Sequence, residues 1–127
     1  MKYLLDTDVV IDHLRKKKIL KTEMLNAGAV ISIITLAELI YGVYKSDSPS
    51  ESFLKLEKAL KLLNLKVENI NELIVSKFAK IKADLEKSGQ RLEDFDLLIA
   101  ATALVNNLTL VTKNLSHFKR IKNLKLG

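Results

Sequence analysis

The fold is decided by residues 3–12, which read YLLDTDVVID. The run at residues 3–6 is typical of a short strand that is buried on both faces. The residues after it predict a helix at about 8–18, and Asp8 is well placed to be the N-cap of that helix. One cap is enough for one helix. Asp6 therefore stands at the end of a buried strand without a structural role, which makes it the first candidate for a catalytic residue.

Strands and helices alternate along the rest of the chain. We expect further strands at residues 29–33, 65–67, 108–111 and 124–126, and further helices at 36–45, 49–63, 71–88 and 96–106. Ser48 and Glu51 form a predicted capping box around Pro49, which would be the first helical residue. Asn71 is the expected N-cap of the next helix, and Gly89 is its expected left-handed stop.

This alternation, with fully apolar strands, indicates an α/β protein whose parallel sheet is covered by helices on both faces. A chain of 127 residues has the size of one domain, so we expect a single domain over residues 1–127. Ligands of such sheets bind outside the carboxyl ends of the strands, near the point where the strand order reverses. Asp6 and Thr112 both follow predicted strands, so we expect them at the same edge of the sheet.

Composition excludes several classes of protein. Apolar residues make up 48% of the chain, and no apolar run reaches the roughly 18 residues that a membrane-spanning helix needs. We expect no signal peptide, because Asp6, Asp8 and Asp12 interrupt the segment that would have to be apolar. The chain has no cysteine, which excludes disulfides, thiolate metal sites and a cysteine nucleophile. These features together predict a cytoplasmic protein without a membrane partner.

The charge balance points to a polyanionic partner. Lys and Arg number 21 against 15 Asp and Glu, a net charge of +6. The excess is concentrated in two runs, which are Arg15, Lys16, Lys17, Lys18 and Lys21, and then Lys113, Lys119, Arg120, Lys122 and Lys125. A lysine-rich surface that is simply solvated is the plain alternative. Two basic runs beside a cluster of acids favour binding of a nucleic acid.

Glu38 is the only charged residue between Ala27 and Lys45. Its spacing from Thr35 fits a capping box, in which Glu38 would reach back to the start of a helix. The alternative is a carboxylate that faces a polar site among apolar neighbours. The pattern of residues by itself leaves both roles open.

Asp94 and Asp96 are two residues apart, which would place them on different faces of a helix. Both can serve one site only if Asp94 precedes the helix as its N-cap. Asp96 would then open a helix whose next residues on the same face are Ala100 and Ala103. We favour Asp96 as a metal ligand, and capping or support of the site for Asp94.

Carboxylates that converge need a counter-charge. Two unit charges about 4 Å apart repel by roughly 4 kcal/mol at an effective dielectric constant of about 20. Oxygen ligands without His or Cys select Mg²⁺ or Mn²⁺ rather than Zn²⁺. Such an ion can hold a scissile phosphate and activate water. Only His13 and His117 are present, and we assign both to structural or surface roles rather than to acid–base catalysis.

Four segments resemble motifs of the PIN-domain ribonucleases, and among these the VapC-type toxins of prokaryotic toxin–antitoxin pairs. The segments are LLDTDVVID at residues 4–12, ISIITLAELIYG at 31–42, DFDLLIAATA at 94–103 and LVTKN at 110–114, with His117 and Phe118 shortly after. Their order and spacing match the family over nearly the whole chain.

The resemblance implies a three-layer, PIN-like α/β/α sandwich, a homodimer, and Mg²⁺-dependent cleavage of RNA, with Mn²⁺ able to substitute. It also implies a VapB-like antitoxin whose C-terminal segment occupies the active-site groove. By position, Asp6, Glu38 and Asp96 would be the catalytic acids and the metal ligands, with Glu38 binding directly or through water. The candidate substrate-binding residues are Thr7, Thr112 and Lys113. The RNA target would be a tRNA, such as an initiator tRNA, or a ribosomal RNA loop.

One position departs from the family pattern. Many relatives have a fourth acid where this chain has Asn114, whose amide oxygen can bind a metal but adds no charge. Asp94 and Asn114 therefore remain further candidate ligands.

Two rival functions stay open. Residues 6–8, DTD, also look like the start of a haloacid-dehalogenase phosphohydrolase, but Val9 and Val10 replace the Gly-Thr that usually follows. The other rival is a PIN module that binds RNA or protein without catalysis. The presence of all three acids argues against that reading.

Overall fold

A four-stranded parallel sheet forms the centre of the computed structural model, which describes residues 2–127. The strands are β1 (Tyr3–Leu5), β2 (Ala29–Ser32), β3 (Lys66–Glu68) and β4 (Thr109–Val111), in the spatial order β3-β2-β1-β4. Every neighbouring pair is parallel. Successive strands are added on one side of β1 up to β3, and β4 is then added on its other side. The strand order therefore reverses between β1 and β4.

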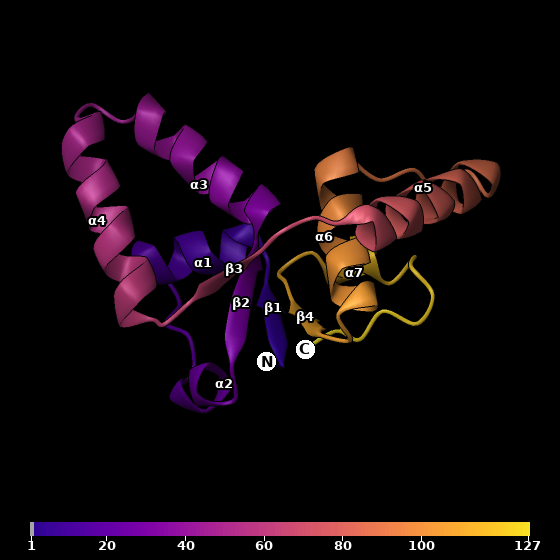
Figure 1. The fold of residues 1–127 in the computed structure, drawn as a ribbon, viewed down its shortest axis with the longest axis horizontal. Coiled ribbons are helices and arrows are strands. Elements are labelled where there is room, and N and C mark those ends of the chain that lie inside the picture. Colours follow the sequence, from indigo (N-terminus) through magenta and orange to yellow (C-terminus); the bar gives the residue numbers. More distant parts are fainter. Residues whose placement is uncertain (1) are drawn as a thin grey trace.

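Helices cover both faces of this sheet (Figure 1). One group comprises α1 (Thr7–Leu14), α2 (Thr22–Asn26), α3 (Ile33–Lys45) and α4 (Pro49–Leu62). The other group comprises α5 (Glu72–Lys87), α6 (Asp94–Val105) and α7 (Leu115–Phe118). Within residues 2–127, no helix combines the length and the apolar character needed to cross a membrane.

The core is divided into two layers by the alternation of side chains along the strands. Leu4 and Val30 are fully buried in a cluster with residues of α5 and α6. Their neighbours Leu5 and Ile31 are fully buried in a second cluster with residues of α1, α3 and α4. Successive residues of a strand point to opposite faces, so the central strands β1 and β2 carry apolar side chains on both faces, whereas the edge strand β3 (sequence KVE) is only partly buried. The predicted three-layer α/β/α sandwich is confirmed.

The first helix differs from the prediction at both ends. It begins at Thr7, and its N-cap is Asp6, whose Oδ1 accepts a hydrogen bond from the Thr7 backbone N–H at 2.9 Å. It ends at Leu14 rather than near residue 18, and Lys16 has a left-handed φ of 58° that breaks the helical path. The assignment of the cap to Asp8 was wrong, and Asp6 has a structural role after all.

The helix after β2 begins earlier than predicted. Ser32 is the N-cap of α3, and its hydroxyl oxygen accepts a hydrogen bond from the Ile34 backbone N–H at 3.0 Å. Thr35 and Glu38 therefore lie inside the helix, and the capping box proposed for them is wrong. Since neither side chain is used at the helix start, both are available for other contacts.

Two other predicted helix signals are confirmed. The Asn71 side chain caps α5 by accepting from the Ile74 backbone N–H at 3.0 Å, and Gly89 follows this helix with a left-handed φ of 70°. Pro49 is the first residue of α4, as predicted, but Ser48 makes no side-chain capping bond. The capping box with Glu51 is therefore wrong, and the fixed φ of proline is the local signal that starts this helix.

The C-terminal part holds the remaining differences. Helix α6 begins at Asp94 with Glu93 as its N-cap residue, so the capping role predicted for Asp94 is wrong. The strand predicted at residues 124–126 is reduced to one bridge between Leu110 and Leu126. The short helices α2 and α7 were not predicted. Helices of four or five residues depend on tertiary contacts rather than on a pattern along the chain.

Candidate active site

Asp6 and Thr112 meet at the point where the strand order reverses. Asp6 follows β1 and Thr112 follows β4, and the Thr112 hydroxyl donates to Asp6 Oδ2 at 2.7 Å. Asp6 is only 5% exposed. Its other carboxylate oxygen accepts from the Thr7 backbone N–H. Both oxygens of Asp6 are thereby oriented, and the predicted contact between these two strand ends is confirmed.

Glu38 is joined to the same edge of the sheet through Thr7. The Thr7 hydroxyl donates to Glu38 Oε1 at 2.6 Å, and its oxygen lies 3.0 Å from the hydroxyl of Thr35. Thr7 and Thr35 are both buried. This contact ties the start of α1 to α3 and holds the Glu38 carboxylate at Thr7, the residue that follows Asp6 in the chain.

Asp96 completes the group from the first turn of α6. Burial raises the pKa of Asp96, and the charges of Asp6 and Glu38 raise it further. Burial is also the main cause that raises the pKa of Asp6, although its hydrogen bonds from Thr112 and Thr7 act in the opposite direction. The charges of Asp6 and Glu38 therefore both act on Asp96, so carboxylates from three separate parts of the chain meet at one site.

The structure tests whether these acids fit a metal ion. Over residues 2–127, Asp6, Glu38 and Asp96 form no ion pair with any lysine, arginine or histidine, so their charge is left uncompensated. Within the same range, no three acidic or histidine side chains are close enough together to enclose a metal. Mg²⁺ fits this arrangement, because it keeps several waters and binds one or two carboxylates directly.

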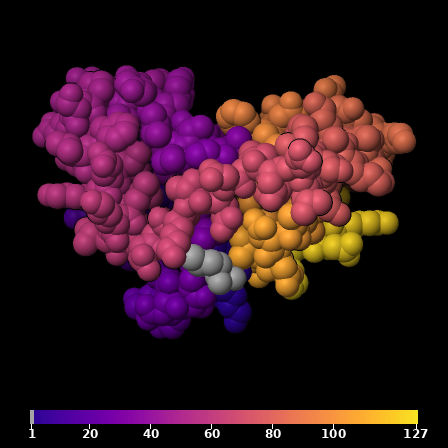
Figure 2. All heavy atoms as spheres, viewed as in Figure 1, coloured from indigo at the N-terminus to yellow at the C-terminus, as the bar shows by residue number. Residues whose placement is uncertain are grey.

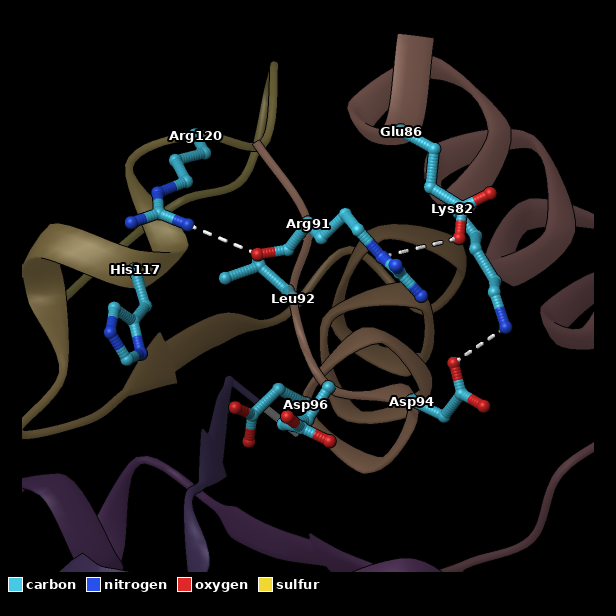
Figure 3. A pocket seen from close by; sticks show the side chains of 9 residues that line it. Lys82, Glu86, Arg91, Leu92, Asp94, Asp96, His117 and Arg120 are labelled. Atoms are coloured by element: carbon cyan, nitrogen blue, oxygen red, sulfur yellow. Dashed lines mark hydrogen bonds and ion pairs between the residues drawn. The ribbon is translucent and has the colours of Figure 1, made fainter. Parts of the chain in front are cut away.

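Two other predicted site residues are paired elsewhere. Lys82 Nζ lies 2.9 Å from Asp94 Oδ1, and Figure 3 shows the Asp94 side chain directed to that lysine. Lys113 Nζ lies 2.8 Å from Asp12 Oδ2. This contact lowers the pKa of Asp12 and raises that of Lys113. Asp94 and Lys113 are therefore not drawn into the carboxylate group.

The remaining candidate, Asn114, lies just beyond β4 as the N-cap residue of α7. Its backbone N–H donates to the Thr112 hydroxyl oxygen at 3.0 Å, so the side chain that orients Asp6 is itself held in place. Its own side chain makes no capping bond. Asn114 therefore supports the site through its backbone, and its side chain stays a candidate.

The two histidines have different environments. His13 Nδ1 accepts from the Leu20 backbone N–H at 2.9 Å, which is the structural role predicted for it. His117 is exposed on α7 and lies near Asp96, whose pKa its charge lowers. His117 was predicted to have a structural or surface role, and its exposure agrees with a surface position. Its proximity to Asp96 was not predicted, and the signals for it were its place in the family motifs and its position shortly after the strand that leads to Thr112.

Two hollows in the surface each have one of these acids in their lining, Glu38 in the first and Asp96 in the second. One, of about 870 Å³, is lined by Thr7, Glu38, Tyr41 and Phe95 among others. The other, of about 350 Å³, is lined by Asp96 and by residues of α5, α7 and the segment before α6. In Figure 2 the molecular surface is notched between the lobe of α3 and α4 and the lobe of α5 and α6. An extended ligand that crossed the carboxylates would enter both hollows.

Comparison with known proteins identifies this architecture. The family model described as "PIN domain" matches residues 3–124. The chain belongs to the PIN domain family. The resemblance stated from the sequence motifs is thereby confirmed, and the match includes every member of the carboxylate group.

Individual relatives of this PIN domain are similar over almost their whole length. Ribonuclease VapC1 of Methanocaldococcus jannaschii is 38% identical over 98% of this chain and 85% of the relative. A tRNA(fMet)-specific endonuclease VapC of Shigella flexneri is 31% identical over 98% of this chain and 96% of the relative. The crystal structure of VapBC2 from Rickettsia felis, bound to a DNA fragment from their promoter, contains a chain with a TM-score of 0.89 and 34% identity. That match covers 100% of this PIN domain and 98% of the other chain.

Proposed function

We propose that this PIN domain is a divalent-metal-dependent endoribonuclease, and that it is the cytoplasmic toxin of a toxin–antitoxin pair. The observation that carries the proposal is the group of Asp6, Glu38 and Asp96, whose negative charges are close enough to affect one another and have no cationic partner. A site with this charge needs a cation before it can accept a phosphodiester. The curated names of the relatives support the same reading.

The three acids are proposed to bind the metal ion, and Thr7 and Thr112 are proposed to orient the carboxylates. Asp6, Glu38 and Asp96 would hold Mg²⁺ or Mn²⁺, with Glu38 binding directly or through water. Thr112 and the Thr7 N–H fix the two oxygens of Asp6, and the Thr7 hydroxyl fixes one oxygen of Glu38. Because hydrogen bonds already orient these carboxylates, little reorganisation is needed when a cation binds. The bound ion would supply Lewis acidity and a water molecule of lowered pKa.

Asn114 and Asp94 contribute less in this proposal. Asn114 remains a candidate for an additional ligand through its amide oxygen. We leave Asp94 out of the ligand set, because binding a metal would require it to break the ion pair with Lys82. Thr7 and Thr112 are proposed to act mainly through the carboxylates that they orient.

Cleavage of RNA in the presence of Mg²⁺ tests the enzyme directly. We expect the purified protein to cut RNA when Mg²⁺ or Mn²⁺ is added and to stop when EDTA is added. Total RNA with its tRNA and ribosomal RNA is the first substrate to use, because one relative is named as specific for tRNA(fMet). Sequencing of the cleavage ends identifies the target. RNA that binds and stays intact would favour the non-catalytic module, and hydrolysis of a small phosphomonoester alone would favour a phosphohydrolase.

A VapB-like antitoxin is the proposed protein partner, since solved structures of relatives contain VapBC complexes. A groove of about 410 Å³ between α1, α3 and α4, lined by Leu39, Val43 and Leu56 among others, offers an apolar surface next to Glu38. We expect expression of the chain alone to arrest growth, and co-expression of the neighbouring small gene to relieve the arrest. Absence of arrest at every level of induction would contradict the role as a toxin. The homodimer stays a prediction from the resemblance.

A further inference from the structure

A second polar site lies beside Asp96, in the hollow of about 350 Å³ between α5, α6 and α7. We call it the Arg120 pocket. Its lining combines the cations Lys82, Arg91 and Arg120 with the acids Glu86, Glu93, Asp94 and Asp96, and His117 lies among them. Figure 3 shows His117 and Arg120 on the α7 side, Arg91 entering from the segment before α6, and Asp96 below them. Three cationic side chains and four carboxylates therefore line this hollow, and one of the carboxylates is the proposed catalytic acid Asp96.

The three cations differ in how well they are neutralised. Lys82 is held by Asp94 at 2.9 Å. Arg91 Nε lies 3.8 Å from Glu86 Oε2, which is a looser contact at a solvent-exposed position. Arg120 has no carboxylate within ion-pair distance over residues 2–127, and its Nη1 donates to the backbone carbonyl of Arg91 at 3.1 Å. Arg120 is the cation of this pocket whose charge is free for a ligand.

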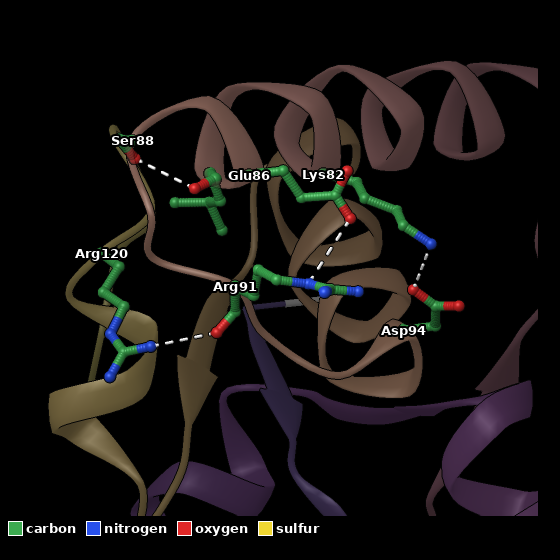
Figure 4. A network of polar contacts seen from close by, with 7 residues as sticks. Lys82, Glu86, Ser88, Arg91, Asp94 and Arg120 are labelled. Atoms are coloured by element: carbon green, nitrogen blue, oxygen red, sulfur yellow. Dashed lines mark hydrogen bonds and ion pairs between the residues drawn. The ribbon is translucent and has the colours of Figure 1, made fainter.

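The contact between Arg120 and Arg91 also orients the free guanidinium. Figure 4 shows this contact next to the ion pairs of Arg91 with Glu86 and of Lys82 with Asp94. A guanidinium has five N–H donors in a planar fork, and the backbone carbonyl uses only one side of it. The remaining donors match the geometry of a phosphate, which arginine binds through two parallel hydrogen bonds.

The position of the pocket identifies which phosphate it would take. An RNA strand placed at the carboxylates carries further phosphates on both sides, and each of them is repelled by the acids. A bound metal offsets the repulsion only at the phosphodiester to be cut. A free arginine next to Asp96 can offset it for an adjacent phosphate. Phosphate contacts of this kind fix the register of a nucleic acid without reading its sequence.

We propose that the Arg120 pocket binds an RNA backbone phosphate next to the phosphodiester that is cut, with Arg120 as the main contact and Arg91 as a second one. The proposal rests on the proposed ribonuclease function, because it takes the carboxylates as the place of cleavage. It assigns a substrate-binding role to residues outside the carboxylate group. Arg120 is a binding residue in this scheme, and it holds the strand in register.

The test separates binding from cleavage. The Arg120→Gln variant removes the charge, and Arg120→Lys keeps the charge without the planar fork. We expect Arg120→Gln to raise KM for RNA by about tenfold while kcat changes little. The plot of log affinity against log salt concentration should become shallower by about one unit. Arg120→Lys should keep the slope and recover part of the affinity.

Lys80→Gln is the matched control, because Lys80 is an exposed cation of α5 that pairs with Asp84 and is not among the residues that line the pocket. It should leave KM and the salt slope close to those of the wild type. Unchanged KM and slope in Arg120→Gln would overturn the proposal, and so would a loss confined to kcat. Weaker binding of a co-expressed protein partner with unchanged RNA affinity would assign the pocket to that partner instead.

Binding is also measured without catalysis, by the fluorescence anisotropy of a labelled single-stranded RNA in EDTA. If the wild type binds this RNA through Arg120 but cleaves nothing when Mg²⁺ or Mn²⁺ is added in place of EDTA, the ribonuclease assignment fails and the phosphate site stands as an RNA-binding site. If the wild type cleaves RNA and Arg120→Gln binds it equally well, the pocket proposal fails and the ribonuclease assignment stands. A wild type that neither binds nor cleaves RNA overturns both.

Discussion

Asp96→Asn is expected to reduce RNA cleavage by about 100-fold or more while the protein stays folded. The substitution keeps the shape of the side chain and removes the charge that would help to hold the divalent ion. Its effect should therefore appear in kcat at saturating Mg²⁺. Far-UV circular dichroism should remain that of the wild type. Near-normal turnover in this variant would show that Asp96 is not one of the catalytic acids.

The same variant should be more stable than the wild type when no metal is present. Burial and the charges of Asp6 and Glu38 raise the pKa of Asp96 above 3.8. Protonated Asp96 therefore stabilises the folded state relative to the unfolded chain. This stabilisation is fully present below pH 3.8 and is lost as the pH rises through the raised pKa of Asp96 in the folded protein. Asparagine carries no charge, so at pH 7 in EDTA the melting temperature of the variant should exceed that of the wild type by a few degrees.

Two further measurements make this stability prediction specific. The difference in melting temperature should shrink as the pH falls through the raised pKa of Asp96 and its carboxylate becomes protonated. Added Mg²⁺ should raise the melting temperature of the wild type by mass action and that of the variant much less. Asp84→Asn is the control, because Lys80 lowers the pKa of Asp84 and the side chain is exposed. It should retain activity and gain no stability.

Phe118→Ala is expected to cost about 3–5 kcal/mol of the free energy of unfolding. Phe118 is 0% exposed and packs in the core cluster with Leu97, Leu110 and Ile121. Its removal leaves a cavity under α7, the short helix that carries His117 and leads to Arg120. Urea unfolding, with the midpoint and the slope fitted together, measures the loss.

Leu115→Ala on the same helix provides the comparison. Leu115 is 43% exposed, so its truncation should change stability by no more than about 0.5 kcal/mol. A loss below about 1 kcal/mol in Phe118→Ala would mean that the surrounding side chains fill the cavity. In that case α7 would not depend on Phe118 as its anchor.

Local signals in the chain predicted a large part of the fold. Asn71 and Gly89 each specify one end of α5 through contacts or dihedral angles within a few residues. The apolar segments predicted the four strands to within about two residues. For the central strands the reason is that a strand buried on both faces has to be apolar throughout, whereas the edge strand β3 has the polar sequence KVE and is only partly buried. Asp6 was singled out for its position at a strand end, and the structure places it at the reversal of the strand order.

Local signals failed where two residues could perform the same task. Asp6 and Asp8 were both suitable caps for α1, and Ser32 and Thr35 were both suitable for α3. The choice between them depends on where each strand leaves the sheet, which is decided by pairing with other strands. The ion pair between Asp94 and Lys82 joins residues 12 apart on two packed helices, and no pattern near Asp94 indicated it.

The amino-acid sequence by itself predicted the alternation of strands and helices and the buried character of the sheet. It also predicted the three acids that the family motifs contain. Tertiary structure alone decided how those acids are oriented, because the hydroxyl of Thr112 reaches Asp6 across 106 positions. It also brought Arg91 and Arg120 together beside Asp96. Hydrogen bonds and charges act over a few ångströms, so residues distant along the chain affect one another only after packing has brought their elements into contact.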